Sequence, residues 1–342
     1  MFEGESLEKL KQVVSRPQKT AVIAHKNPDG DTIGSALALY FYLVSRGHDV
    51  SMMVPNGFPD FYAWMPGIEN MLVYEKQPDA VKKNLKDAAT VFCLDFNDTG
   101  RVGAMSELLQ QAGGMKIMID HHPGPTDEFD LYFSDIAASS TGEIVYELIA
   151  GLGDEELITK DVAVSLYTAI MTDTGSFSYS CNNARTYEIV ARLISAGVDV
   201  SLVHRLVYDT FTENRLRLLG YSLSEKMTVW HNLRVAVIAL DKADLQKFDY
   251  RIGDTEGLVN YPLSMKDVNV SVLITQREGV FRLSFRSKGD FPVNRVAKEY
   301  FDGGGHKNAS GGNSYLGLKE TMEKLKKVFL RFKNELDYEI KY

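Results

Sequence analysis

The sequence predicts an α/β protein: a largely parallel sheet with helices on both faces, followed by a smaller α/β domain. Two observations predict this fold class. In the first half of the chain, short apolar runs typical of buried strands alternate with helical segments, which is the pattern of a parallel sheet. In the last third, two strand-like runs follow one another as in a hairpin. The 342 residues are enough for two ordinary domains.

The period of the hydrophobic residues locates each element of the first half in turn. Strands are expected at residues 21–24, 50–54, 90–95, 116–119 and 131–134. Helices are expected at residues 32–45, 141–150, 160–171 and 184–196. Gly47 and Gly197 follow the first and the last of these helices and act as stop signals.

The second half begins with an amphipathic segment, residues 201–229, that we expect to be a helix connecting two domains. Beyond it we expect a strand at 233–240, a hairpin of 268–275 and 280–285 turning at Glu278-Gly279, and helices at 294–300 and 319–336. The predicted organisation is a first domain over residues 1–200, a connector over 201–230 and a second domain over 231–342.

Composition excludes several classes of protein. The net charge of −8 argues against a nonspecific binder of duplex DNA, which would need a basic face. No apolar stretch approaches the roughly 18 residues of a membrane span, and the acidic N-terminus is unlike a signal peptide. Cys93 and Cys181 are too few for a disulfide framework and fit a reducing compartment. We therefore expect a cytoplasmic protein that does not bind membranes.

Three strands expected in the first half end in acidic or imidazole side chains. The strand at 116–119 leads into Asp120-His121-His122, and two others lead into His25 and Asp95. Ligands of open α/β sheets bind at the carboxyl ends of the strands. Adjacent carboxyl and imidazole groups suit a divalent metal ion. We therefore expect a metal site at this edge of the sheet.

A tight turn after His25 carries two further carboxylates, Asp29 and Asp31. Pro28 fixes one backbone angle and Gly30 allows a sharp bend, so the side chains of the turn can converge. The alternative is that the acidic turn only caps the helix that follows it and that His25 is merely packed.

Asp173 follows an apolar helix, at an end where the helix dipole disfavours a carboxylate unless a metal lies opposite. Four carboxylates and two imidazoles without a thiolate suit Mn²⁺, with Mg²⁺ or Co²⁺ as alternatives, rather than structural zinc. The set is too large for one hydrolytic metal and suits two ions about 3.5–4 Å apart, bridged by one carboxylate. Its members are His25, Asp29, Asp31, Asp95, His121 and Asp173.

These blocks resemble the ordered motifs of the DHH phosphoesterase superfamily. The matching residues are 25–31 (HKNPDGD), Leu94-Asp95, Asp120-His121-His122 and Asp173. Residues 303–312 (GGGHKNASGG) are similar to the signature of the DHHA1 domain that often follows. The order and spacing of the motifs match over nearly the whole chain. Its two-domain size is most similar to the bacterial nanoRNase and 3′-phosphoadenosine 5′-phosphate phosphatase group.

The resemblance implies a role for each side chain of the metal site. Asp95 would bridge two ions, the first held also by His25 and Asp29 and the second also by Asp31, His121 and Asp173. Asp120 would orient a histidine, and His122 would face the scissile phosphate as proton donor or charge stabiliser. Asn27 and Arg101 would contact phosphate. Residues 96–101 differ from the commonest family form, which leaves the role of Arg101 open.

In the second domain, Gly303, Gly304 and Gly305 would let backbone N–H groups approach an anion, and His306 adds a titratable donor. The alternative is a glycine-rich turn that ends a helix. The alternating polar residues favour ligand binding, and the resemblance implies that the segment holds the substrate's terminal phosphate or nucleotide. The expected contacts are Gly304, Gly305, His306, Asn308, Ser310 and Arg286.

The predicted function is hydrolysis of short oligoribonucleotides or dinucleotides to mononucleotides, and of 3′-phosphoadenosine 5′-phosphate to AMP. A cyclic-di-AMP or linear pApA phosphodiesterase, an inorganic pyrophosphatase and a non-catalytic nucleotide-binding module are alternatives. The Asp-Thr-Gly sequences at Asp98 and Asp173 also match aspartic proteases, but that chemistry needs a β-rich setting and would leave the metal-type residues unexplained. Small nucleotides or short RNA are the expected partners, and a homodimer remains open.

Overall fold

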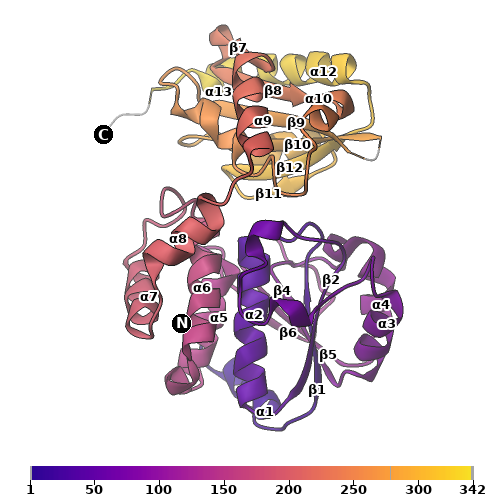
Figure 1. Ribbon diagram of the computed structural model, residues 1–342, viewed down its shortest axis with the longest axis vertical. Helices are drawn as coiled ribbons and strands as arrows, with labels where there is room; N and C mark the ends of the chain where they lie inside the picture. The colour runs from indigo at the N-terminus through magenta and orange to yellow at the C-terminus, as the bar shows by residue number, and fades with distance from the viewer. Residues whose placement is uncertain (1, 278, 340–342) are drawn as a thin grey trace. The chain divides into compact units, whose positions relative to one another are not determined.

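The computed structural model describes residues 2–277 and 279–339 in two compact units, one ending at Thr210 and the other beginning at Phe211 (Figure 1). Glu278, a turn residue of the expected hairpin, lies outside the described residues. Within the described ranges, no helix has the length and apolar character needed to cross a membrane.

The first unit is built on a six-stranded parallel sheet with the order β3-β2-β1-β4-β5-β6. Its strands are β1 (Lys19–Ala24), β2 (Asp49–Val54), β3 (Met71–Val73), β4 (Thr90–Leu94), β5 (Met115–Asp120) and β6 (Leu131–Ser134). Its helices are α1 (Glu5–Val14), α2 (Gly30–Ser45), α3 (Pro78–Asp87), α4 (Ser106–Gln111), α5 (Thr141–Gly151), α6 (Lys160–Asp173), α7 (Ala184–Ser195) and α8 (Val200–Tyr208).

The central strands are buried on both faces, because successive side chains of a strand point to opposite sides. Val22 of β1 and Phe92 of β4 belong to the core under α1, α2, α5 and α6, whereas Ile23 and Cys93 belong to the core that includes α3 and α4. Figure 1 shows the two helical layers on opposite faces of the sheet. This arrangement confirms the predicted fold class and explains the apolar runs that predicted the strands.

Two glycines allow α2 and α5 to lie close to α6. A Cβ atom at Gly30 would lie 2.2 Å from the Thr172 hydroxyl oxygen, and one at Gly142 would lie 2.5 Å from the Ala169 methyl group. Both contacts are too short for any side chain. The absence of a Cβ therefore brings Asp173, at the end of α6, close to the first turns of α2 and α5.

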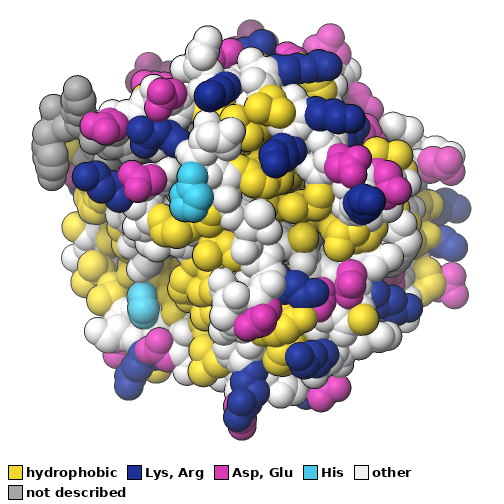
Figure 2. Space-filling view, turned by 90° about the horizontal axis from the view of Figure 1, so that it is seen from above, with side chains coloured by type: hydrophobic (Ala, Val, Ile, Leu, Met, Phe, Trp, Pro, Cys, Tyr) yellow, Lys and Arg dark blue, Asp and Glu magenta, His cyan; other side chains and the backbone are white. Residues whose placement is uncertain are grey.

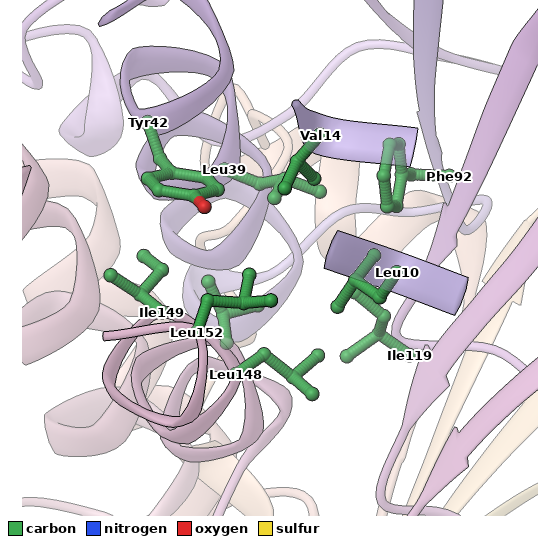
Figure 3. A pocket seen from close by; sticks show the side chains of 10 residues that line it. Leu10, Val14, Leu39, Tyr42, Phe92, Ile119, Leu148, Ile149 and Leu152 are labelled. Carbon is green, nitrogen blue, oxygen red and sulfur yellow. The ribbon is translucent and has the colours of Figure 1, made fainter. Parts of the chain in front are cut away.

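A small apolar cavity lies in the core under α1 (Figure 3). Leu10 of α1 faces Leu148 of α5 across it, and Phe92 of β4 closes another side. The hydroxyl of Tyr42, which also lines the cavity, donates a hydrogen bond of 2.6 Å to Asp154. The lining thus offers hydrocarbon surface, and the cavity is a gap in core packing rather than a site for a polar ligand.

The second unit contains a six-stranded mixed sheet with the order β11-β12-β10-β9-β8-β7, in which β8 and β9 are parallel and the other pairs antiparallel. Its strands are β7 (Met227–Trp230), β8 (Val235–Leu240), β9 (Val270–Arg277), β10 (Val280–Ser287), β11 (Gly304–Gly305) and β12 (Ala309–Ser314). Its helices are α9 (Glu213–Ser224), α10 (Lys242–Lys247), α11 (Val293–Tyr300), α12 (Leu318–Arg331) and α13 (Lys333–Leu336).

The segment expected to be one connecting helix is divided. Its first part is α8, which ends at Tyr208, and its second part is α9, which begins after the capping residue Thr212. The Thr212 hydroxyl accepts a hydrogen bond of 3.1 Å from the Arg215 amide, which starts a new helix. Leu218 of α9 packs in the core of the second unit. The prediction of a single helix over 201–229 was wrong, because a capping threonine starts a second helix and residues 227–229 belong to strand β7.

Charged side chains of both signs are interspersed with hydrophobic ones on the face that Figure 2 shows. Over the whole chain, acidic side chains outnumber basic ones, which gives the net charge of −8.

Candidate active site

The carboxyl ends of β1, β4 and β5 lie side by side, because Ala24 pairs with Leu94 and Leu94 with Ile119. His25 and Asp95 follow the first two strands directly, and β5 ends with Asp120. The backbone of Asp95 has a positive φ of 64° while its amide donates to Ile119 at 3.0 Å. This left-handed conformation is tolerated better by Asp and Asn than by most residues, and it occurs where the chain leaves the strand.

Asp95 belongs to one of two groups of side chains that could each hold a metal ion, and it lies next to the other group. Ligand atoms of His25, Asp29 and Asp95 lie within 4.8 Å of one another, and so do those of a second group, Asp31, His121 and Asp173. The Nε2 atom of His121 lies 3.7 Å from Asp95 and 3.5 Å from Asp173. The structure thus brings together all six residues that the sequence singled out as candidate ligands.

The imidazoles of His25 and His121 each direct Nε2 towards carboxylates. Nδ1 of His25 lies 2.9 Å from the Lys26 carbonyl oxygen, and Nδ1 of His121 lies 3.4 Å from that of Ala138. A carbonyl can only accept, so these contacts favour a proton on Nδ1. When the ring is neutral, Nε2 keeps its lone pair and is available as a metal ligand, an arrangement typical of ligating histidines.

The pKa values of the carboxylates in the cluster are shifted in different directions. Burial, followed by the charges of Asp95 and Asp173, raises the pKa of Asp31 well above its usual range. Burial above all raises the pKa of Asp173 to about 6. For Asp95, the effect of burial is outweighed by the hydrogen bond and charge of His25, and the pKa lies well below its usual range.

No lysine or arginine forms an ion pair with these carboxylates in the described part of the chain. Asp31 and Asp95 are nevertheless only 1% and 2% exposed. Buried carboxylates without a lysine or arginine partner are costly, and a divalent cation would neutralise them. The donor set, oxygen-rich with imidazole nitrogens, fits such an ion.

Two of the acidic residues also have structural roles. Asp29 caps α2 by accepting a hydrogen bond of 3.0 Å from the Thr32 amide. Asp31 accepts hydrogen bonds of 2.7 Å and 2.9 Å from the amides of Thr141 and Gly142, at the start of α5. The capping alternative considered for this turn therefore describes part of its role, and the same carboxylates still face the histidines.

The Asp120–His122 pair forms a third part of the site. One oxygen of Asp120, which is fully buried, lies 2.7 Å from Nδ1 of His122, and the other accepts the His122 amide at 2.9 Å. The amide group of Asn97 donates to the His122 carbonyl oxygen at 3.1 Å. This geometry fixes the ring of His122 and allows its other nitrogen to act on a substrate.

Thr32 and Thr141, two hydroxyl groups that the sequence did not single out, hold Asp95. Thr32 Oγ1 lies 2.7 Å from one carboxylate oxygen of Asp95 and 2.7 Å from Nε2 of His25, and Thr141 Oγ1 donates to the other oxygen at 3.0 Å. The sequence offered one indication of this role, since each threonine lies in the first turn of a helix and Thr32 directly follows the motif of residues 25–31.

The two expected phosphate contacts of the first domain lie around His25. Asn27 is exposed, has a positive φ of 58° and donates its backbone amide to the Asn56 side chain at 2.7 Å. Burial and, to a smaller extent, the charge of Arg101 lower the pKa of His25, but the hydrogen bond and charge of Asp95 leave that pKa raised overall. Its carbonyl oxygen accepts the Lys26 amide at 2.9 Å.

The glycine-rich segment of the second unit contains a pair of short strands, β11 and β12, rather than only a turn that ends a helix. A Cβ at Gly303 would lie 2.0 Å from the Gly311 carbonyl oxygen, and one at Gly305 would lie 2.7 Å from that of Ala309. These glycines are required for close pairing of the backbone. Gly304 differs, because no described atom lies within 4 Å of its Cβ position, so a ligand could approach it.

The other expected contacts of the second unit do not form one group. In the register of β10 and β12, Ser310 pairs with Phe285, whereas Arg286 pairs with Ala309 on the opposite face. Ser310 is accordingly buried at 5% exposure. The Asn308 amide group donates to the Gly289 carbonyl oxygen at 2.8 Å and to the Ser287 hydroxyl at 2.9 Å.

Arg286 and His306 are both partly buried. Arg286 donates from Nη1 to the carbonyl oxygen of Phe285 at 3.0 Å. Of the expected contacts, Gly304 alone is exposed, and Gly305 is half-buried like Arg286 and His306.

Comparison with known proteins supports the same interpretation. The chain matches the family models for the DHH family, N-terminal domain, over residues 19–170 and the DHHA1 domain over residues 232–335. It is 30% identical to a probable bifunctional oligoribonuclease and PAP phosphatase of Streptococcus mutans, covering 85% of this chain and 88% of that protein. It is 28% identical to a cyclic-di-AMP phosphodiesterase of Listeria monocytogenes, covering 87% of this chain but 45% of that protein.

Among solved structures, an exopolyphosphatase-related protein of Bacteroides fragilis is 41% identical. It superposes with a TM-score of 0.92 over 97% of this chain and 98% of its own.

A parallel sheet with a buried cluster of carboxylates and imidazoles at its strand ends, joined to a second α/β unit, defines a metal-dependent phosphoesterase. The chain belongs to the DHH family, with a DHHA1 domain as its second unit, and is a hydrolase of phosphate ester bonds.

Proposed function

We propose that this protein hydrolyses short oligoribonucleotides or dinucleotides to mononucleotides, and 3′-phosphoadenosine 5′-phosphate to AMP, with two Mn²⁺ ions as cofactors. The observation that carries the proposal is the pair of ligand groups that meet at Asp95. The similarity to the oligoribonuclease and PAP phosphatase of Streptococcus mutans over most of both chains supports the substrate class.

His25, Asp29 and Asp95 would hold one ion, and Asp31, Asp95, His121 and Asp173 the other. Two ions of this kind supply activation of water for in-line attack on phosphorus and stabilise the negative charge that develops. Thr32 and Thr141 hold Asp95 by its two oxygens, so that the shared carboxylate keeps one orientation.

His122 would act on the substrate directly. Asp120 accepts a hydrogen bond from Nδ1 of His122 at 2.7 Å. Nε2 would then face the substrate, and its proton could be donated to the leaving oxygen or stabilise charge on the phosphate. Arg101 and Asn27 would bind phosphate oxygens from the side of His25.

Recognition of the nucleotide is assigned to the second unit, through Gly304, Gly305, His306 and Arg286. Gly304 leaves its backbone open to an anion, and Arg286 can bind phosphate with its guanidinium group. Ser310 and Asn308 would contribute through the shape of the β11–β12 pair, because one is buried and the other donates to Ser287 and Gly289.

A substrate panel with purified protein and Mn²⁺ tests the proposal. We expect release of mononucleotides from short RNA and linear pApA and of phosphate from 3′-phosphoadenosine 5′-phosphate, and no release of phosphate from pyrophosphate. The similarity to the Listeria enzyme makes cyclic-di-AMP the second candidate substrate. Turnover of cyclic-di-AMP with none of the linear substrates, or of pyrophosphate alone, would contradict the proposal.

A further inference from the structure

Glu143 is a fully buried carboxylate that the proposed chemistry does not use. One of its oxygens accepts hydrogen bonds from the Ser139 hydroxyl at 2.5 Å, the Ser139 amide at 3.3 Å and the Thr186 hydroxyl at 2.7 Å. The other oxygen lies 3.2 Å from Nε of Arg185. A buried charge held this closely by neighbouring groups fixes the segments that supply those groups.

Arg185, on α7, is surrounded by three acidic residues. Besides Glu143, it forms an ion pair with Asp135 at 2.9 Å and a hydrogen-bonded ion pair with Glu147. Asp135 begins the turn that leads from β6 to α5, and Glu143 and Glu147 belong to the first turns of α5. One guanidinium group therefore connects both ends of the turn formed by residues 135–140.

This turn and the start of α5 contact three residues of the metal cluster. The Ala138 carbonyl oxygen lies 3.4 Å from Nδ1 of His121, and the Thr141 hydroxyl donates to Asp95 at 3.0 Å. The amide of Thr141 donates to Asp31 at 2.7 Å. A shift of the turn would therefore displace two ligands of the second group, His121 and Asp31, together with Asp95.

The geometry points to Arg185 and Glu143 as positioning residues for the metal cluster, acting through residues 135–142. This inference rests on the proposed function for the identity of the metal ligands. The two residues would contact neither substrate nor metal. They would hold His121, Asp95 and Asp31 at the separation that the ions require, as partners behind a metal site commonly do.

The test compares Arg185→Met, Arg185→Lys and Glu143→Gln with Arg192→Met, a control on the same helix whose exposed guanidinium faces Glu155 at 3.7 Å. Mn²⁺ affinity is measured by calorimetry on metal-stripped protein, with kcat and KM for linear pApA. We expect Arg185→Met and Glu143→Gln to weaken Mn²⁺ binding roughly 10- to 100-fold and to lower kcat more than they change KM. Arg185→Lys should recover part of the loss, and Arg192→Met should match the parent.

If the other variants fail to fold, Thr186→Val provides a milder change, because it removes only one hydrogen bond to Glu143. We expect this variant to weaken Mn²⁺ binding as well, by a smaller factor. The inference is overturned if the folded variants bind Mn²⁺ with the affinity of the parent. This holds even if the variants are less stable, because an equal fall of the melting temperature in EDTA and in Mn²⁺ would indicate a role in folding alone. A parent protein that binds Mn²⁺ but cleaves no nucleotide would refute the proposed function alone, because the affinity comparison would still decide the role of Arg185.

Discussion

The two sheets of this protein present polar groups in different ways. In the first unit, parallel strands end at one edge, and acidic and imidazole side chains from β1, β4 and β5 meet those of α2 and α6 in a buried cluster. In the second unit, a mixed sheet ends in the short β11–β12 pair, where glycines expose backbone rather than side chains. From this contrast we expect the first unit to carry the chemistry, which needs charged groups in fixed positions, and the second unit to bind the substrate, which needs backbone that the substrate can reach.

The largest effect is expected at the residue on which the cluster depends. Asp95→Ala should remove nearly all activity and weaken binding of the second ion, because this carboxylate belongs to one ligand group and lies 3.7 Å from Nε2 of His121 in the other. Metal analysis and turnover of pApA measure the two effects. Asp98→Ala is the control: it removes an exposed cap that accepts the Gly100 amide, which costs about 1 kcal/mol of stability at most sites of this kind. Full activity with two tightly held ions in Asp95→Ala would contradict the assignment.

The two adjacent histidines should behave differently. His121→Ala should lose metal, because Nε2 of His121 faces Asp31, Asp95 and Asp173. His122→Ala should keep both ions and lose kcat by about 10²–10⁴-fold, the range for a general acid or base. Metal content and kcat of the two purified variants decide the matter. The opposite pattern would show that their roles are reversed.

A smaller effect, confined to nucleotide substrates, is expected in the second unit. His306→Ala should lower kcat/KM for dinucleotides by about 10²-fold through lost positioning, with bound metal and hydrolysis of bis(p-nitrophenyl) phosphate unchanged. Lys307→Ala, which removes an exposed ion pair with Asp290, is the neighbouring control. Equal losses on both substrates, or loss of metal, would place His306 in the catalytic centre and remove the division between the units.

The smallest effects are expected at two glycines, one required for strand pairing and one exposed to solvent. Gly303→Ala should lower the free energy of unfolding by about 1–3 kcal/mol, because its Cβ would meet the Gly311 carbonyl oxygen. Gly304→Ala should change stability by no more than about 0.5 kcal/mol but weaken nucleotide binding. Chemical denaturation and KM for pApA measure these effects. Equal stability of the two variants would indicate that the β11–β12 pairing is not as tight as described.

The parallel sheet and the cluster at its edge were predictable because their signals are local. Apolar runs marked β1, β4 and β5, and the side chain that follows each run is read directly from the chain. The three residues of β3 are too few to give a recognisable pattern, whereas α3, which is amphipathic and begins with Pro78, carried a signal that was not used. The roles of individual ligands, taken from the motifs, remain predictions.

What could not be predicted depends on contacts between distant segments. The hydroxyls of Thr32 and Thr141 acquire their role only when α2 and α5 meet β4. The orientation of Ser310 depends on its register with β10, and β12 is too rich in glycine and polar residues to be recognised as a strand. A capping threonine likewise separated α8 from α9 within an uninterrupted amphipathic pattern.

Asp31 connects occupancy of the cluster to the backbone of a helix. Its carboxylate accepts the amide protons of Thr141 and Gly142 while lying 3.7 Å from Nε2 of His121. A cation that holds this carboxylate in its charged form also strengthens both hydrogen bonds to the first turn of α5. Exchange of these two amide protons with deuterium would then become slower when metal binds. Measuring this exchange would show, without any substrate, whether the metal site is occupied.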